Sequence, residues 1–115
     1  MSSRPLKLDK YGISWAAFKE LEWHCLQYAQ KKAEIASGDR RHERDVLYIE
    51  IAANIAGGDY EEYLLRMVTM HIGENKMLKE MQYAIKRGRL HKMRVMFYVI
   101  LYGLRNGDLE VEDCD

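Results

Sequence analysis

Basic side chains gather near the C-terminal end of the sequence, at a spacing that could bind an anion. Between Lys76 and Arg105 there are eight lysines and arginines and one acid, Glu80, a net charge of +7. Most of them crowd the first half of a helix predicted over 86–104. Cations at a helix N-terminus oppose the helix dipole by about 0.3–1 kcal/mol each, so helix stability does not explain them. The pattern indicates either an anionic partner or a helix face that simply carries charge into solvent.

The order of elements around this basic helix is that of a helix-turn-helix unit, which we expect over 74–104. A short helix is predicted over 74–81, followed by a turn and then the basic helix. In such units the first residues of the second helix enter the major groove, where an arginine fork matches guanine or phosphate. Arg87 and Arg94, two turns apart, are expected on one exposed face. The candidate residues for binding nucleic acid or another partner are Lys76, Lys79, Lys86, Arg87, Arg89, His91, Lys92 and Arg94.

The second half of the basic helix is apolar on nearly all sides. One stripe is expected to face the core and comprises Leu90, Met93, Phe97, Ile100, Leu101 and Leu104. Val95, Val99 and Tyr102 form a second stripe opposite the first. This second stripe is a candidate dimer seam, although we favour the alternative that the helix is the central helix of the core.

The rest of the chain predicts further helices and no strand. A single proline and an abundance of Ala, Leu, Glu, Lys and Met favour helices. Ser14 is expected to cap the first helix, and Asp59 with Glu62 to form a capping box at the third. The first helix should bury Trp15, Phe18, Leu21 and Cys25. The expected helices cover 14–36, 41–56, 59 to about 72, 74–81 and 86–104.

The length and composition fit one compact domain. With 115 residues, of which 48% are hydrophobic and 31% charged, the chain predicts an all-α bundle of four to five helices over 1–107. Residues 1–13 are expected to form an N-terminal arm, and 108–115 an acidic tail. Such a tail is typically a solvated, disordered end. A sharper alternative is that its five acids screen the basic helix within the same molecule.

Several function classes find no support in the sequence. No apolar run approaches twenty residues and no signal-peptide pattern opens the chain, so we expect a soluble cytoplasmic protein without a membrane partner. Cys25 and Cys114 form neither a disulfide framework nor a metal spacing. The four histidines are scattered, and no phosphate loop or nucleophile elbow is present. We therefore expect no enzyme, no metal and no cofactor.

Short motifs along the chain resemble small phage and prophage regulators of the RinA/ArpU type. The resemblance covers roughly 11–104 and rests on Tyr11-Gly12-Ile13-Ser14, Phe18-Lys19-Glu20-Leu21, Cys25-Leu26-Gln27-Tyr28, Arg44-Asp45, Ile49-Glu50-Ile51-Ala52-Ala53, Glu62-Tyr63-Leu64-Leu65 and Val68-Thr69. It implies an activator of late phage genes, acting in the bacterial host cytoplasm through a helix-turn-helix similar to region four of sigma factors. Arg87 falls where the turn Arg of that family would lie, and Leu90-His91 where its aromatic pair would be. Arg94 and Phe97 match its basic and Phe positions. Ala84-Ile85-Lys86 replaces its Pro-Cys-Gly turn, and Met93 one of its arginines.

Two functions follow from these patterns. The first is a phage-type regulator that binds double-stranded DNA through the basic helix. The second is a phage-encoded inhibitor of a host defence nuclease, similar to anti-CRISPR proteins, which would bind a protein or ribonucleoprotein and which fits the altered turn. In either case the protein is expected to act without a cofactor, and a homodimer is the further partner to consider.

Overall fold

The computed structural model describes residues 6–109, which form helices and turns with no strand. The all-α prediction is therefore confirmed. Short 3-10 turns lie at Asp9–Tyr11 and Gly58–Tyr60. The α-helices are α1 (Trp15–Leu26), α2 (Tyr28–Ala36), α3 (Glu43–Gly57), α4 (Glu61–Thr69), α5 (Glu74–Glu80) and α6 (Arg87–Asn106).

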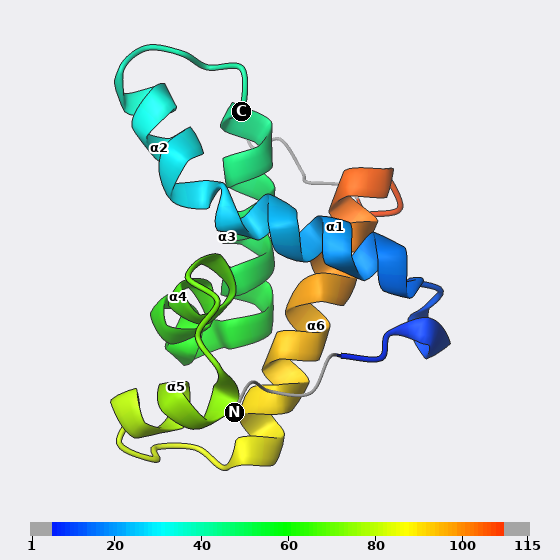
Figure 1. The fold of residues 1–115 in the computed structure, drawn as a ribbon, viewed down its shortest axis with the longest axis vertical. Helices are drawn as coiled ribbons and strands as arrows, with labels where there is room; N and C mark the ends of the chain where they lie inside the picture. The colour runs from blue at the N-terminus through cyan, green and yellow to red at the C-terminus, as the bar shows by residue number, and fades with distance from the viewer. Residues whose placement is uncertain (1–5, 110–115) are drawn as a thin grey trace.

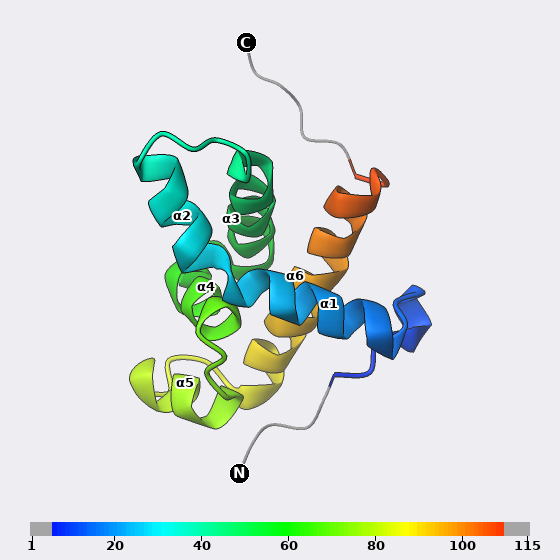
Figure 2. The ribbon, with the colours of Figure 1, turned by 45° about the horizontal axis from the view of Figure 1, so that its top comes forward.

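The longest helix, α6, is the central element of the bundle. It packs most extensively against α3 and also contacts α1, α4 and α5. Figures 1 and 2 show α1 crossing α6, with α4 and α5 gathered at the end where α6 begins. The end of α3 also lies there, so α3, α4 and α5 all lie around the first turns of α6. No helix among residues 6–109 is long and apolar enough to cross a membrane.

The apolar stripe expected on α6 is confirmed as the centre of the core. All six of its side chains are buried, and Leu90, Phe97 and Leu101 are fully so. Phe97 and Phe18 each meet the ring of Tyr98 edge to face, with centroids 5.1 and 5.0 Å apart. Edge-to-face contacts of this kind add to the free energy gained by burial, because the positive edge of one ring meets the negative face of another.

One predicted helix is two helices in the structure. The helix expected over 14–36 is interrupted at Gln27, whose backbone leaves helical geometry and whose N–H donates to the carbonyl of His24 at 3.2 Å. The bend brings Lys31 of α2 back to His24, with Lys31 Nζ 3.2 Å from His24 Nδ1 and 3.1 Å from Asp45 Oδ2 of α3. Local periodicity does not register such a bend, because both pieces keep helical spacing.

One helix cap is confirmed and the other is wrong. Ser14 Oγ accepts a hydrogen bond from the Ala17 amide at 3.1 Å, as an N-cap should. The Asp59–Glu62 capping box does not form. Asp59 lies inside a 3-10 turn, α4 begins at Glu61, and Tyr60 precedes it without a side-chain cap. Gly58, whose φ of 54° favours glycine, leads the chain from α3 into this 3-10 turn, and the cap position of α4 therefore falls on Tyr60 and not on Asp59.

The N-terminal segment contributes side chains to the core, whereas Trp15 does not. The Trp15 side chain is 61% exposed, so the expectation that it is buried is wrong. Leu6, Leu8 and Ile13 are buried in the core. The described part of the expected arm, 6–13, therefore belongs to the domain.

A glycine turn ends α6. Gly107 is left-handed, with φ 78°, while the Asp108 amide donates to the Gly103 carbonyl at 2.9 Å and the Gly107 amide to that of Leu104 at 3.4 Å. This pattern of two bonds is the Schellman motif. The Leu109 side chain lies so close to Gly103 that a Cβ there would be 2.9 Å away. The expected acidic tail begins at Asp108, but 110–115, including Cys114, lies outside the described residues.

Candidate nucleic-acid interface

The first two turns of α6 present the basic side chains expected from the sequence. Lys86 precedes the helix in an extended conformation, and the first turn holds no acid. Arg87, Arg89, His91 and Lys92 are all exposed, whereas Leu90 between them is buried. Lys76 and Lys79 of α5 are also exposed, and α5 packs beside this part of α6. The short helix, the turn and the basic helix thus place seven of the eight candidate residues at the surface.

A buried carboxylate, Glu74, neutralises part of this charge. Glu74 begins α5 and is only 4% exposed. Its Oε2 is 2.9 Å from His91 Nδ1 and 3.3 Å from Arg94 Nη1, and its Oε1 is 3.9 Å from Arg87 Nε. These three residues are spaced i, i+4 and i+7 on one face of α6. The single Glu74 carboxylate of α5 can therefore form ion pairs with all three side chains.

Arg94 is the candidate residue whose expected exposure is wrong. It was expected to share an exposed face with Arg87, but it is 8% exposed. The shared face is real, yet α5 and the Glu74 carboxylate cover its Arg94 end. Burial without a counter-ion would be costly, and Glu74 supplies that counter-ion. Arg94 is therefore part of the packed structure and does not reach a partner in this arrangement.

Five of the candidate residues are exposed cations without an ion pair to any residue in 6–109: Lys76, Lys79, Lys86, Arg89 and Lys92. Arg89 is held in place by an aromatic ring, with its guanidinium carbon 5.4 Å from the Tyr60 ring centroid. Between these side chains lies Gly88, where a Cβ would meet no atom within 4 Å. The backbone of α6 is therefore open to a partner at the middle of the basic surface.

The candidate dimer seam lies farther along α6. Val95, Val99 and Tyr102 are half-buried and pack against the core of the same chain. This packing agrees with the alternative that α6 is the central helix of the core. It also leaves these three side chains less surface to offer a second copy.

The turn between α5 and α6 has an unusual backbone. Gln82 and Tyr83 are consecutive non-glycine residues with positive φ, 54° and 56°. Each such conformation costs about 1–2 kcal/mol, and surrounding contacts must offset it. The Tyr83 amide donates to the Leu78 carbonyl at 2.9 Å, which closes α5, and the Ile85 side chain is buried beneath the turn. The sequence contains no glycine here that would have signalled such a turn.

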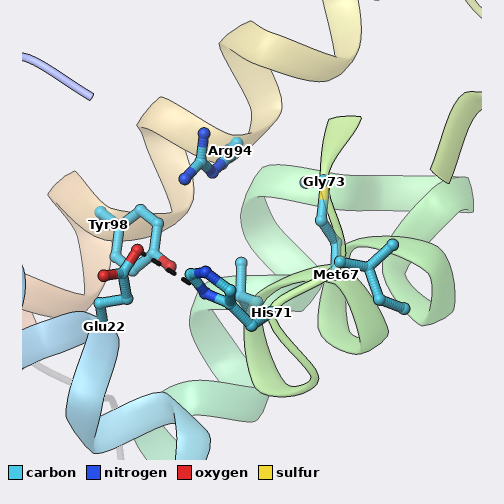
Figure 3. A pocket seen from close by; sticks show the side chains of 8 residues that line it. Glu22, Met67, His71, Gly73, Arg94 and Tyr98 are labelled. Carbon is cyan, nitrogen blue, oxygen red and sulfur yellow. Dashed lines mark ion pairs between the residues drawn. The ribbon is translucent and has the colours of Figure 1, made fainter. Parts of the chain in front are cut away.

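Arg94 also borders a small polar pocket on its other side. The pocket, about 70 Å³, is lined from α1, α4, the following loop and α6. Figure 3 shows Arg94 and Tyr98 projecting from α6 toward Glu22 and His71, which form an ion pair at 4.0 Å when the histidine is protonated. Burial raises the pKa of the Tyr98 hydroxyl, so this group stays protonated. The pocket lining combines polar groups with the apolar side chains of Met67, Val68 and Ile72, and Arg94 is one wall of it, which agrees with a structural role for Arg94.

Two further buried groups have altered acidity without forming a reactive site. Burial, with the nearby Arg105 and Lys31 charges, lowers the pKa of His24 to about 4. Burial raises the pKa of the Cys25 thiol to about 12, which makes it a poor nucleophile at neutral pH. Among the residues described, no three His, Cys, Asp or Glu side chains gather in a way that could hold a metal ion.

Sequence reasoning missed Glu74 as a member of the site. A signal was present, since Glu74, Met77, Leu78 and Met81 recur at i, i+3, i+4 and i+7 and so share the inward face of α5. An acid on an apolar stripe predicts a buried carboxylate that needs a partner.

Comparison with known proteins finds no protein-family model that matches the chain, and no curated protein or solved structure that is significantly similar to it. The resemblance to RinA/ArpU regulators therefore stays a prediction from short motifs.

Proposed function

We propose that this protein binds double-stranded DNA through the exposed cations of α5 and the first turns of α6, as a transcriptional regulator of the phage type. The observation that carries the proposal is the set of five exposed candidate cations, without an ion pair in residues 6–109, carried by α5 and the start of α6, which pack against each other. Phosphate contacts by lysine and arginine supply most of the affinity of such proteins. Arg87 and His91, exposed but tethered to Glu74, add donors at defined positions.

We expect two kinds of DNA contact from these side chains, to phosphates and to bases. Lys76, Lys79 and Lys86 are flexible point charges suited to phosphate, which orient a protein without reading sequence. Arg89 and Lys92 lie on the side of α6 that faces away from Glu74. The open backbone at Gly88 lets the helix end approach a groove closely. This division assigns any base contact to Arg87, Arg89 or Lys92.

The experiment is a salt titration of affinity for a mixed-sequence duplex, followed by fluorescence anisotropy. Log K should fall with log salt at about −0.9 per phosphate contact, which gives a slope near −4.5 if all five unpaired cations take part. The double variant Lys79→Ala/Lys86→Ala should make the slope less steep by about 2. Arg44→Ala, an exposed arginine at the start of α3 away from this surface, should leave it unchanged. A flat slope, or no binding at low salt, would contradict the proposal.

A protein partner is the second candidate, in the form of an inhibitor of a host defence nuclease. Its support is an exposed apolar side chain beside the cations, since Met96, which is 39% exposed, lines one groove with Arg89 and Lys92. Arginine and methionine together are enriched at protein interfaces. If DNA binding is absent, salt-dependent capture of a purified defence nuclease by the native chain, lost in Arg89→Ala, would favour this function.

A further inference from the structure

A groove lies between the end of α3 and the α6 face that points away from Glu74. Its volume is about 450 Å³, within the range of about 300–1,000 Å³ usual for small-molecule sites. It is lined by Ala56, Gly57, Gly58, Asp59, Arg89, Lys92, Met93 and Met96.

One wall of the groove is a continuous stripe of α6. Arg89, Lys92, Met93 and Met96 recur at i, i+3, i+4 and i+7, so they share one helix face. Met93 is buried, whereas Met96 is 39% exposed. The opposite wall has almost no side chains, because Ala56, Gly57 and Gly58 end α3. Methionine thioethers adapt to apolar bodies of different shape, so this stripe suits an organic group.

The net charge of the groove lining is positive, and an aromatic contact restrains one of its two cations. Arg89 and Lys92 form no ion pair within residues 6–109, and Arg89 lies over the Tyr60 ring. A cation stacked in this way loses less freedom on binding an anion than a free side chain would. Asp59 stands on the opposite rim, where its carboxylate repels a second negative charge on a ligand.

We propose that this groove binds an amphipathic organic monoanion. The anionic group lies between Arg89 and Lys92, and the apolar body lies along Met93 and Met96. Binding at the groove does not require DNA binding, although the two would share Arg89 and Lys92. The site is therefore tested on the free protein, so that its failure is distinct from failure of the proposed function.

The test is a titration of the full chain, carrying ¹³C-methyl methionine, with 8-anilinonaphthalene-1-sulfonate as the probe. The chain has seven methionines, which serve as reporters of position. The proposal expects saturable shifts of the Met93 and Met96 methyl signals. Met70, which is 61% exposed on another part of the surface, and the buried Met77 should keep their positions. Equal shifts at Met70, or none at Met96, would overturn the proposal.

Variants then test the anionic half of the site. Arg89→Ala/Lys92→Ala should weaken the probe about tenfold or more, because a charge-assisted hydrogen bond is lost. The matched double variant Arg44→Ala/Lys10→Ala also removes one arginine and one lysine, and Lys10 too lies over a ring, that of Tyr11 at 5.2 Å. It should bind the probe as the native chain does. N-phenyl-1-naphthylamine, which lacks the sulfonate, should bind at least tenfold more weakly. Equal affinity for both compounds, or equal loss in both double variants, would show a non-specific apolar surface.

Discussion

The two sides of the α6 N-terminal half carry the same kinds of side chain in opposite environments. On one side Arg87, His91 and Arg94 converge on the buried Glu74. On the other, about half a turn away, Arg89 and Lys92 border an open groove and form no ion pair in the described chain. The first side binds α6 to α5, and the second is free for a partner.

This difference shows why a count of charges along a helix overstates its binding surface. Consecutive basic residues are equivalent in the sequence, but a carboxylate from another helix divides them. A buried ion pair is stringent about geometry and is disrupted when one partner is removed, whereas an exposed cation contributes little to folding. The two sides should therefore respond to mutation in different measurements.

The largest effect should come from removing the shared carboxylate. Glu74→Gln leaves the Arg94 guanidinium buried without a counter-ion, so we expect the free energy of unfolding to fall by about 3–5 kcal/mol in urea titrations. Glu80→Gln, which breaks the more exposed pair with Arg66 at 3.1 Å, should cost about 1 kcal/mol or less. Equal losses in the two variants would mean that Glu74 is not an exceptional acid.

Acid should destabilise the fold through His24, which limits the pH at which the two sides can be compared. The pKa of His24 is about 4 in the folded chain, against an ordinary value of 6.5 for a histidine in an unfolded chain, so the unfolded chain takes up the proton first. The contribution of neutral His24 to the free energy of unfolding is therefore fully present above about pH 6.5, decreases as the pH falls, and is lost below about pH 4. We expect a loss of about 2 kcal/mol after allowance for solvent screening of the partly exposed Arg105 charge, which helps to lower this pKa. A free energy of unfolding that stays constant across this window would contradict the effect.

The two exposed arginines sharpen the comparison within DNA binding itself. Arg89→Ala should weaken duplex binding by about 1–2 kcal/mol, because it removes an unpaired donor. Arg87→Ala should weaken it by less than half of that, because Glu74 already offsets the Arg87 charge. Both variants should unfold within about 0.5 kcal/mol of the native chain. Affinity measured at one fixed salt concentration distinguishes them, and a greater effect of Arg87 would reverse the assignment of the two sides.

The smallest effect concerns the backbone between the two sides. Gly88→Ala places a methyl group in open space on a helix, so the chain should become more stable by about 0.5 kcal/mol. If a DNA groove approaches this backbone closely, the same variant should bind duplex more weakly. Thermal unfolding and anisotropy on one preparation would show both changes, and unchanged affinity would place the partner's surface elsewhere.

Much of the fold could be predicted because its signals are local. The apolar stripe of α6 and the Ser14 cap are each set by residues within a few positions, and both are found in the structure. The break at Gln27 could not be predicted in this way. It is accompanied by contacts of Lys31 with His24 and Asp45, and Asp45 lies on another helix.

The candidate site could be predicted only in outline. The positions of Lys86, Arg89 and Lys92 at the surface follow from helical spacing. The burial of Arg94 depends on Glu74, twenty residues away, and on the turn at Gln82 and Tyr83 that lays α5 beside α6. Such a turn depends on tertiary packing, because neither residue favours positive φ by itself.

The glycine turn that ends α6 lies far from the basic start of the same helix. Helix α6 is 20 residues long, about 30 Å, so its basic first turns lie at the end opposite to Gly107 and Asp108, where the acidic sequence begins. The chain as a whole has a formal net charge of zero. Near a polyanion the net attraction on such a molecule is small, but the field exerts a torque on it. This torque rotates the molecule so that the start of α6 faces the polyanion before contact. Encounter would then be governed by orientation, and raising the ionic strength would slow productive association by shortening the distance over which that torque acts.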